Sequence, residues 1–521
     1  MAGKQQPFQS LSRVDRNRVH IQNPYHVPAT LFAQEEVPVE ADGIAQFLQF
    51  LSLQHTAQRI SKAQKDGTIP GYWGHVPGEI ERVVLTPDFH KGGGIPVGTV
   101  AKTRGMLIPQ AVGNDICCGM RLLVTDLTRE QLEPHLDSLE KTLRGIFFEG
   151  KRDIPMSPKQ REALLRDGLW GLHQTAYENQ GKGLWRFYHP DVQERDLERV
   201  HFNGVLPTDG LFGFGDFVKA SGKHSGYDSQ IGSVGGGNHF VEVQVVEELM
   251  DGDIAHAWGI KPDRVAIMIH TGSVGLGHMV GSHFRDIARS IYPKSLKHPK
   301  HGFYFLPTTG PHAKQAAAYL SAMGNAANFA FGNRLFLGLM TLRALSEVCG
   351  HQVQGDLIYD VPHNLIWKVP GEDETFVHRK GACPAFGPNP DLAGPFQYTG
   401  DPVIIPGSMG DSSFLLAGNG KEAALQSACH GAGRSLARGQ ARKVEASVYQ
   451  ETFQPLRVVT PIDPKCPKVR SRQDILTKYH QHMKEEAPYA YKPVTAVIET
   501  VTDAGIASKV ARMWPLLTVK G

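Results

Sequence analysis

The chain of 521 residues has few cysteines and no long apolar run. Its six cysteines include an adjacent pair, and cysteine this sparse argues against the disulfide framework of a small secreted protein. No uncharged apolar run approaches the roughly 20 residues that a membrane span needs, and residues 1–17 lack the apolar segment of a secretion signal. We therefore expect a cytoplasmic location and no association with membranes.

The sequence also lacks a strong charge of either sign. A formal net charge of +3 is too small to diagnose a nucleic-acid-binding protein, although a local basic patch could still follow phosphates. With 41% hydrophobic and 21% charged residues, the composition is that of an ordinary globular protein. The length suggests two or more domains, but no Pro/Ser-rich linker interrupts the motifs between Pro87 and Lys520. We predict one catalytic domain over residues 41–521, preceded by a polar, irregular N-terminal extension over residues 1–40.

Sequence patterns predict an α+β fold with mixed sheets. Short β-branched runs alternate with glycine turns between Arg82 and Thr125, and residues 234–249 return to a strand pattern. The stretch Ala313–Cys349 is rich in alanine and leucine, contains no proline, and predicts a long scaffold helix. A further helix is expected to open near ACHGAGRSLARGQARKV, which begins at Ala428.

Five potential metal ligands lie in short motifs, most of them rich in glycine: Asp115 and Cys118 in VGNDICCGM, His239 in GGGNHF, His270 in HTGSVGLGH, and His363 in DVPHN. Glycine lets the backbone approach a bound ion closely, so the recurring pattern predicts one site built from several loops. The two intervening residues let Asp115 and Cys118 face one metal centre. Thiolate, imidazole and carboxylate ligands suit Zn, Mn, Fe or Co, and the softness of the ligands does not distinguish among these metals.

A sixth candidate, His430 in ACHGAGR, is interpreted as a separate reactive group. The GAG that follows it predicts a tight turn into a helix, a geometry that suits a phosphate, with Arg434 adding charge. The GSMG of residues 407–410 could form a second phosphate cradle. No GxxxxGK[ST] phosphate loop and no Lys-x-Asp-Gly of lysine-nucleotidylating ligases is present. If a nucleotide is activated, lysine is therefore not its expected carrier.

From about Arg82 to Gly521 the chain resembles the RtcB-type RNA ligases. An ordered series of motifs carries the resemblance: PDFHKGGGIPVG, VGNDICCGM, GGGNHFVEV, HTGSVGLGH, DVPHN, VHRKGA, PGSMG, CHGAGR and KVARMWPLLTVKG. The resemblance implies an α+β domain with a central metal and nucleotide cleft. It also implies a GTP- and Mn²⁺-dependent ligase that joins an RNA 3′-phosphate or 2′,3′-cyclic phosphate end to a 5′-hydroxyl end. The biological role that the resemblance implies is RNA repair or tRNA splicing.

The resemblance also assigns roles to residues. Cys118 would bridge two Mn²⁺ ions, with Asp115 and His239 on one ion and His270 and His363 on the other. His430 would be guanylylated and then pass GMP to the RNA, forming an RNA-ppG intermediate. The implied guanylate contacts are His430, Asn238, Glu242, Ser408, Tyr491 and Lys520. The implied partners are RNA and, because some members need one, an archease-type activator protein.

Several residues depart from the family pattern. Arginine is usual at Val274, Pro384 and Trp514, so three cations that could hold an RNA phosphate are missing. Glycine is usual at Cys117 and valine at Asn114. We therefore expect a divergent member with an intact guanylylation apparatus and an altered site for RNA ends.

Two other functions remain open on the sequence. A metal-dependent phosphodiesterase or cyclic-phosphate hydrolase would use the same metal ligands without ligation, but it has no need of His430 as a nucleotide carrier. A non-catalytic RNA-binding scaffold would need neither the ligands nor His430.

Overall fold

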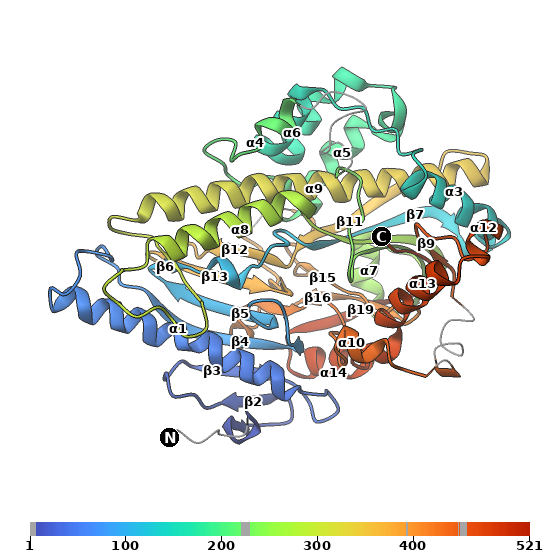
Figure 1. Cartoon of the computed structure of the whole chain (residues 1–521). Helices are drawn as coiled ribbons and strands as arrows, with labels where there is room; N and C mark the ends of the chain where they lie inside the picture. The colour runs from blue at the N-terminus through green and yellow to red at the C-terminus, as the bar shows by residue number, and fades with distance from the viewer. Residues whose placement is uncertain (1–6, 220–229, 392–393, 446, 449–455) are drawn as a thin grey trace.

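Two large sheets form the centre of the computed structural model, which describes residues 7–219, 230–391, 394–445, 447–448 and 456–521 (Figure 1). The first sheet has the strand order β1-β2-β3-β4-β5-β13-β12. Its neighbours are antiparallel except for the parallel pair β3 and β4. The strand bounds are β1 Leu11–Arg13, β2 Arg18–Ile21, β3 Ala29–Phe32, β4 Glu79–His90, β5 Val97–Arg104, β12 Asn364–Lys368 and β13 Thr375–Lys380.

The second sheet has the order β11-β7-β9-β8-β19-β16-β15, and β18 joins β19 in parallel. Two short strand pairs, β6 with β10 and β14 with β17, lie outside the large sheets. The bounds are β6 Met106–Leu107, β7 Gly119–Thr128, β8 Phe240–Leu249, β9 Arg264–Thr271, β10 Leu306–Pro307, β11 Gly355–Pro362, β14 Ala382–Pro384, β15 Pro402–Ile405, β16 Ser413–Gly418, β17 Ser427–Cys429, β18 Val458–Val459 and β19 Ala507–Val519.

The longest helix, α9, is the main scaffold between the second sheet and the outer helices. It runs from Ala313 to Cys349, as the proline-free, alanine-rich stretch predicts, and ends where Gly350 takes a left-handed conformation (φ 74°). It contacts β9, α8, α4 and α3. The other helices are α1 Ala41–Lys65, α2 Arg129–Leu132, α3 Leu136–Phe148, α4 Pro158–Thr175, α5 Pro190–Asp196, α6 Gly215–Lys219, α7 Gly252–Trp258, α8 Val274–Ser290, α10 Arg438–Ala441, α12 Pro467–Arg470, α13 Gln473–Glu485 and α14 Val494–Asp503.

The α+β prediction is confirmed, but residues 11–32 are not irregular as expected. They form β1, β2 and β3, and β3 connects through α1 to the parallel strand β4. Strands of only three or four residues carry too few alternating positions to be recognised in a polar segment. The N-terminal segment therefore extends the first sheet, while the division of the chain at residue 40 stays a prediction.

Among the described residues, every helix is too short or too polar to cross a membrane.

Candidate active site

The five candidate metal ligands come from the ends of neighbouring strands. Asp115 and Cys118 precede β7, His239 precedes β8, His270 lies near the end of β9, and His363 follows β11. In the second sheet β7 pairs with both β11 and β9, and β9 pairs with β8. These pairings carry ligands from four distant parts of the sequence to one edge of the sheet.

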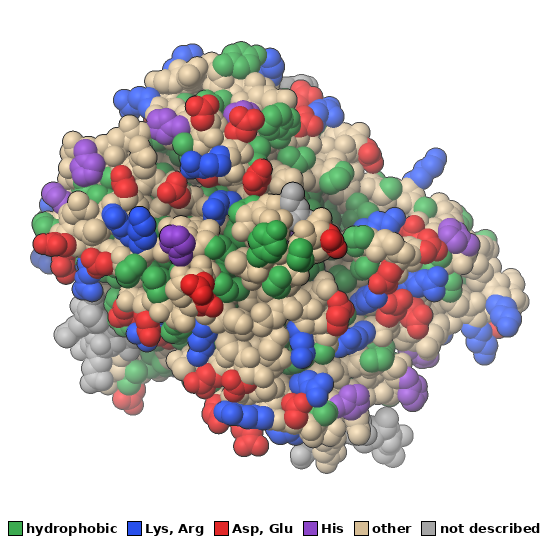
Figure 2. Space-filling view, turned by 180° about the vertical axis from the view of Figure 1, so that it is seen from behind, with side chains coloured by type: hydrophobic (Ala, Val, Ile, Leu, Met, Phe, Trp, Pro, Cys, Tyr) green, Lys and Arg blue, Asp and Glu red, His purple; other side chains and the backbone are tan. Residues whose placement is uncertain are grey.

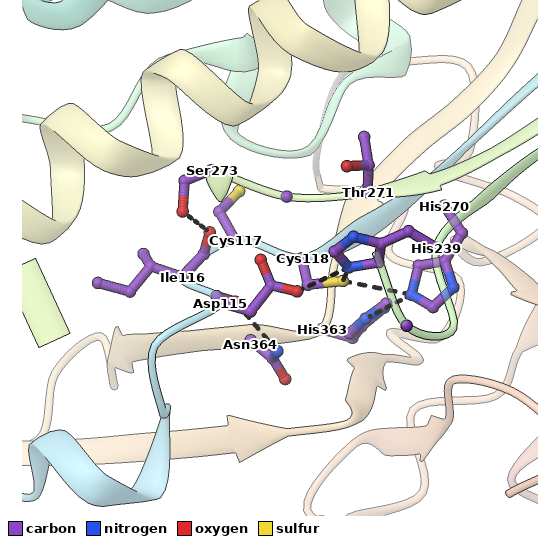
Figure 3. Close-up of polar contacts among 12 residues, drawn as sticks. Asp115, Ile116, Cys117, Cys118, His239, His270, Thr271, Ser273, His363 and Asn364 are labelled. Atoms are coloured by element: carbon purple, nitrogen blue, oxygen red, sulfur yellow. Dashed lines mark hydrogen bonds and ion pairs between the residues drawn. The ribbon is translucent and has the colours of Figure 1, made fainter. Parts of the chain in front are cut away.

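The ligand atoms converge (Figure 3). The Sγ atom of Cys118 lies 3.2 Å from Nε2 of His239 and 3.2 Å from Nε2 of His270. Nε2 of His239 is 2.7 Å from Oδ2 of Asp115, and Nε2 of His270 is 3.2 Å from Nε2 of His363. Cys118 therefore stands in the middle, between an Asp115–His239 pair and a His270–His363 pair.

The electrostatics of this cluster fit a cation. Burial, reinforced by neighbouring positive charge, lowers the pKa of His270 and His363 well below the usual value, so both imidazoles are neutral and offer lone pairs. Burial, reinforced by Asp115, raises the pKa of the Cys118 thiol well above its usual value. A bound metal would remove that thiol proton and offset the charge of Asp115. Two groups of side chains could each hold an ion: Cys118, His239 and His270, and His270, His363 and His430. With Asp115 beside His239, these thiol, imidazole and carboxylate donors fit a transition metal.

The backbone around Cys118 separates the two adjacent thiols. Cys117 has a φ of +56°, the left-handed region that favours glycine, and its Sγ lies 3.8 Å from Nη2 of Arg334. Arg334 of α9 also donates to the carbonyls of Cys117 (2.7 Å) and Thr271 (3.0 Å). Gly272 is equally constrained, because a Cβ there would lie 2.4 Å from Oδ1 of Asp115. The loop therefore directs Cys118 alone into the ligand cluster.

His430 stands beside the metal ligands and is held by a carboxylate. Its ring centroid is 4.5 Å from that of His363. Its Nδ1 is 2.7 Å from Oδ2 of Asp88, a fully buried residue in β4. Burial alone would raise the pKa of Asp88, but the hydrogen bond and charge of His430, with a bond from Thr86, lower it. Asp88 is thus ionised and accepts a hydrogen bond from Nδ1 of His430, so Nε2 is the ring nitrogen that the carboxylate does not hold.

A cavity of about 780 Å³ adjoins this histidine. All six residues with an implied guanylate contact line it: Asn238, Glu242, Ser408, His430, Tyr491 and Lys520. Two of them meet at Glu486, which is buried and also lines the cavity. The hydroxyl of Tyr491 donates a hydrogen bond to Oε2 of Glu486 (2.5 Å), and Nζ of Lys520 lies 3.4 Å from the same oxygen. Glu486 therefore fixes both side chains at the cavity wall.

Glu242 is the second buried carboxylate of the cavity. Thr518 donates to its Oε1 and Gln244 to its Oε2, both at 2.5 Å. Burial raises the pKa of Glu242 to about 7, against the opposing effects of these bonds and of Lys520. A carboxylate at this place can accept two hydrogen bonds from the edge of a base.

The helix expected directly after His430 is absent. Gly433 has a φ of +75°, Arg434 forms an isolated bridge with Tyr491, and the only helix in that stretch is the four-residue α10 from Arg438. The chain bends at residues 431–432, but it then leads into the bridge between Arg434 and Tyr491 rather than into a helix. The cavity there is lined by the loop of residues 431–437, opposite Gly407, Ser408 and Met409 of the GSMG motif.

The three positions with a missing arginine do not line the cavity. Val274 begins α8, two residues after Gly272, and has a φ of +49°. Pro384 is buried in β14, where it pairs with Ser427 of β17. Trp514 is 41% exposed in β19. Val274 lies four residues after His270, and β14, which contains Pro384, pairs with β17 directly before His430.

Sequence reasoning missed Asp88 and Glu486 as functional candidates. Asp88 follows the apolar run RVVLTP, and a carboxylate at the end of an apolar strand needs a partner, which is the signal that could have marked it. Glu486 closes the charged stretch MKEEAP, in which nothing marks one acid as buried. Only the fold brings it against Lys520, 34 residues further on.

Comparison with known proteins places the chain in a family. The model of the family described as tRNA-splicing ligase RtcB matches residues 73–521. The chain belongs to the RtcB family. It is 34% identical to the tRNA-splicing ligase RtcB of Thermococcus kodakarensis, covering 89% of this chain and 93% of the relative. It is also 34% identical to the RNA-splicing ligase RtcB of Mycobacterium tuberculosis (86% and 98% covered) and to the RNA-splicing ligase RtcB homolog 1 of Entamoeba dispar (86% and 80%). RtcB membership supports an RNA ligase function, and the ligand cluster supports use of a metal.

Proposed function

We propose that this RtcB protein is a GTP- and Mn²⁺-dependent RNA ligase that works through a guanylylated His430. The observation that carries the proposal is the Asp88–His430 pair at the wall of the cavity. Asp88 holds the proton on Nδ1, so Nε2 is the nucleophile, in the way a buried carboxylate orients histidine in other enzymes. A metal-dependent hydrolase has no need of a histidine as nucleotide carrier.

The first step is nucleotidyl transfer to the protein. Nε2 of His430 forms a bond to the α-phosphorus of GTP, and the bond from that phosphorus to the bridging oxygen breaks, releasing pyrophosphate. Asp88 stabilises the positive charge that develops on the ring. Two Mn²⁺ ions, held by Cys118 between Asp115–His239 and His270–His363, would act as Lewis acids on the leaving group. Glu242 would accept hydrogen bonds from the guanine edge, while Lys520 and Tyr491, fixed by Glu486, would contact the guanylate.

The next steps join RNA. An oxygen of the RNA 3′-phosphate displaces His430 from the guanylyl phosphorus, which gives RNA-ppG. The 5′-hydroxyl oxygen of the second RNA then bonds to the RNA phosphorus, GMP leaves, and the hydroxyl proton passes to water. A 2′,3′-cyclic phosphate must first be opened by water to supply the 3′-phosphate.

The test is a set of RNA pairs that differ only at their ends, incubated with GTP and Mn²⁺. We expect joining of 3′-phosphate or cyclic phosphate ends to 5′-hydroxyl ends, and none to 5′-phosphate ends. Each reaction is run with and without an archease-type protein, which separates a need for an activator from a lack of activity. Opening of cyclic ends without joining under every condition would contradict the ligase and favour the phosphodiesterase.

A further inference from the structure

Two stretches of this sequence contain no acidic residue. Residues 43–65 and 287–346 hold ten Lys or Arg and not one Asp or Glu. Because the whole chain has a net charge of +3, everything outside these stretches sums to −7. The weak overall charge therefore conceals a strong separation of charge along the sequence.

The fold brings these two stretches together. Residues 43–65 belong to α1, and residues 291–305 form the loop between α8 and β10 (Figure 1). Nη2 of Arg59 in α1 donates to the hydroxyl of Tyr292 and to the carbonyl of Lys297, both at 2.6 Å. The rings of Phe50 and Phe303 pack edge to face at 6.2 Å. The loop is thus fastened to α1 along one surface.

The lysines of this surface point to solvent and have no acidic partner. We call it the α1–loop face and define it by five exposed lysines: Lys62, Lys65, Lys294, Lys297 and Lys300. None of them forms a salt bridge with a residue that the structure describes. Figure 2 shows the back of the molecule, where acidic and basic side chains are interspersed. No described acidic side chain neutralises the positive charge of the α1–loop face, so this charge is available to bind an external anion.

The α1 helix connects the cavity to the α1–loop face. Ala41, at the start of α1, lines the cavity, and Lys62 lies 21 residues further along the helix. At 1.5 Å per residue the face begins roughly 30 Å from the cavity wall. That distance corresponds to about ten nucleotides along one strand of a duplex.

The surroundings favour a polyanion over an acidic protein. Protein interfaces are anchored by exposed aromatic or aliphatic side chains. The large hydrophobic residues exposed in the described chain all lie outside the two stretches: Val14, Trp170, Tyr177, Phe202, Met250, Met279, Tyr398, Val448 and Trp514. A surface of lysines without an apolar anchor suits a phosphate backbone.

We propose that the α1–loop face binds the sugar-phosphate backbone of the substrate RNA, about ten nucleotides from the ends being joined. This inference rests on the proposed ligase function, because that function supplies the RNA. Contacts with the sugar-phosphate backbone do not read the base sequence of the RNA. They give a long, structured RNA an advantage over a short fragment, and they partly compensate for the arginines that this chain lacks at Val274, Pro384 and Trp514.

The test compares two triple variants on RNAs of two lengths. Lys294→Glu, Lys297→Glu and Lys300→Glu are combined in one protein. The matched control combines Lys261→Glu, Lys421→Glu and Lys509→Glu, lysines outside both stretches that likewise form no salt bridge with a described residue. Affinity is measured at several salt concentrations for RNAs of about five and about thirty nucleotides, since only the second spans the distance to the face.

For the long RNA, we expect the loop variant to bind at least about tenfold more weakly and to lose about 2–3 from the slope of log affinity against log salt. The short RNA should bind equally to both variants, and both should accept GMP from GTP as the wild type does. Equal loss in the control, or unchanged long-RNA binding by the loop variant, would overturn the proposal. If the wild type accepts no GMP, the ligase function fails, but the length and salt dependence of binding still decide the role of the face.

Discussion

Asp88 is the residue whose role follows most directly from geometry, because its carboxylate holds Nδ1 of His430 at 2.7 Å. Asp88→Asn keeps the size of the side chain but removes the negative charge and can stabilise the wrong tautomer. We expect GMP transfer to slow by roughly 10³–10⁴-fold, as for asparagine in the corresponding place of a serine protease triad. The measurement is single-turnover labelling at saturating GTP, with metal content as control. A rate within about threefold of wild type would mean that Asp88 does not orient His430.

Cys118 and Cys117 are adjacent, but we predict opposite effects on metal content when each is replaced by alanine. Cys118→Ala removes the central ligand and should lower metal content per chain, because its Sγ lies 3.2 Å from both His239 and His270. Cys117→Ala should leave metal content unchanged, since that thiol faces Arg334. The measurement is elemental analysis of both variants after loading with Mn²⁺. Equal losses in the two variants would show that both thiols bind metal.

Glu242 gives a pH dependence with a definite sign. Its pKa is raised to about 7, so its ionised fraction falls as the pH drops from 8 to 6. Only the ionised form accepts two hydrogen bonds from guanine, so GTP should bind about tenfold more weakly at pH 6 than at pH 8. Calorimetry in a His430→Ala background excludes both the reaction and any contribution of the His430 side chain. Adding Glu242→Gln should flatten the profile, and an unchanged profile would assign the dependence to another group.

At the scale of elements, the expectation of an altered site for RNA ends can be tested at the start of α8. Val274 adopts a φ of +49° immediately after the ligand loop of β9. Val274→Arg restores a cation at no greater backbone strain, and we expect it to raise joining of generic RNA ends while GMP transfer stays constant. A charge-assisted phosphate contact contributes about 1.5–3 kcal/mol, or roughly 10–100-fold. Val274→Gly is the control, because it relieves the left-handed strain without adding charge. A rise with glycine equal to that with arginine would refute the electrostatic reason.

The same scale shows what the sequence could and could not predict. The α9 helix was predictable because 37 residues of alanine- and leucine-rich sequence without proline leave no alternative. The strands that follow Cys118 and His239 were predictable from β-branched runs. The segment after His430 is predicted to turn and enter a helix, but Arg434 pairs with Tyr491 and α10 begins only at Arg438. Glycine and alanine permit either conformation, so the local sequence does not decide between them. The Asp88–His430 contact joins residues 342 positions apart, and no local pattern predicts a pair at that separation.

At the scale of the whole molecule, the two sheets contribute different residues to the candidate site. The second sheet supplies the candidate metal ligands at one end of its strands, while the first sheet supplies Asp88 from β4. The α1 helix, which connects β3 to β4, begins at the cavity and ends in the α1–loop face. On the two proposals made above, nucleotide activation and binding of the RNA body would share one continuous scaffold.

The most direct test of the central proposal is covalent transfer of GMP to His430. Purified protein is incubated with Mn²⁺ and GTP labelled at the α-phosphate, then resolved by denaturing electrophoresis beside His430→Ala with the same metal content. We expect label on the wild type and none on His430→Ala. Label that persists in His430→Ala, or a wild type that binds Mn²⁺ yet acquires no label, would contradict a guanylylated His430.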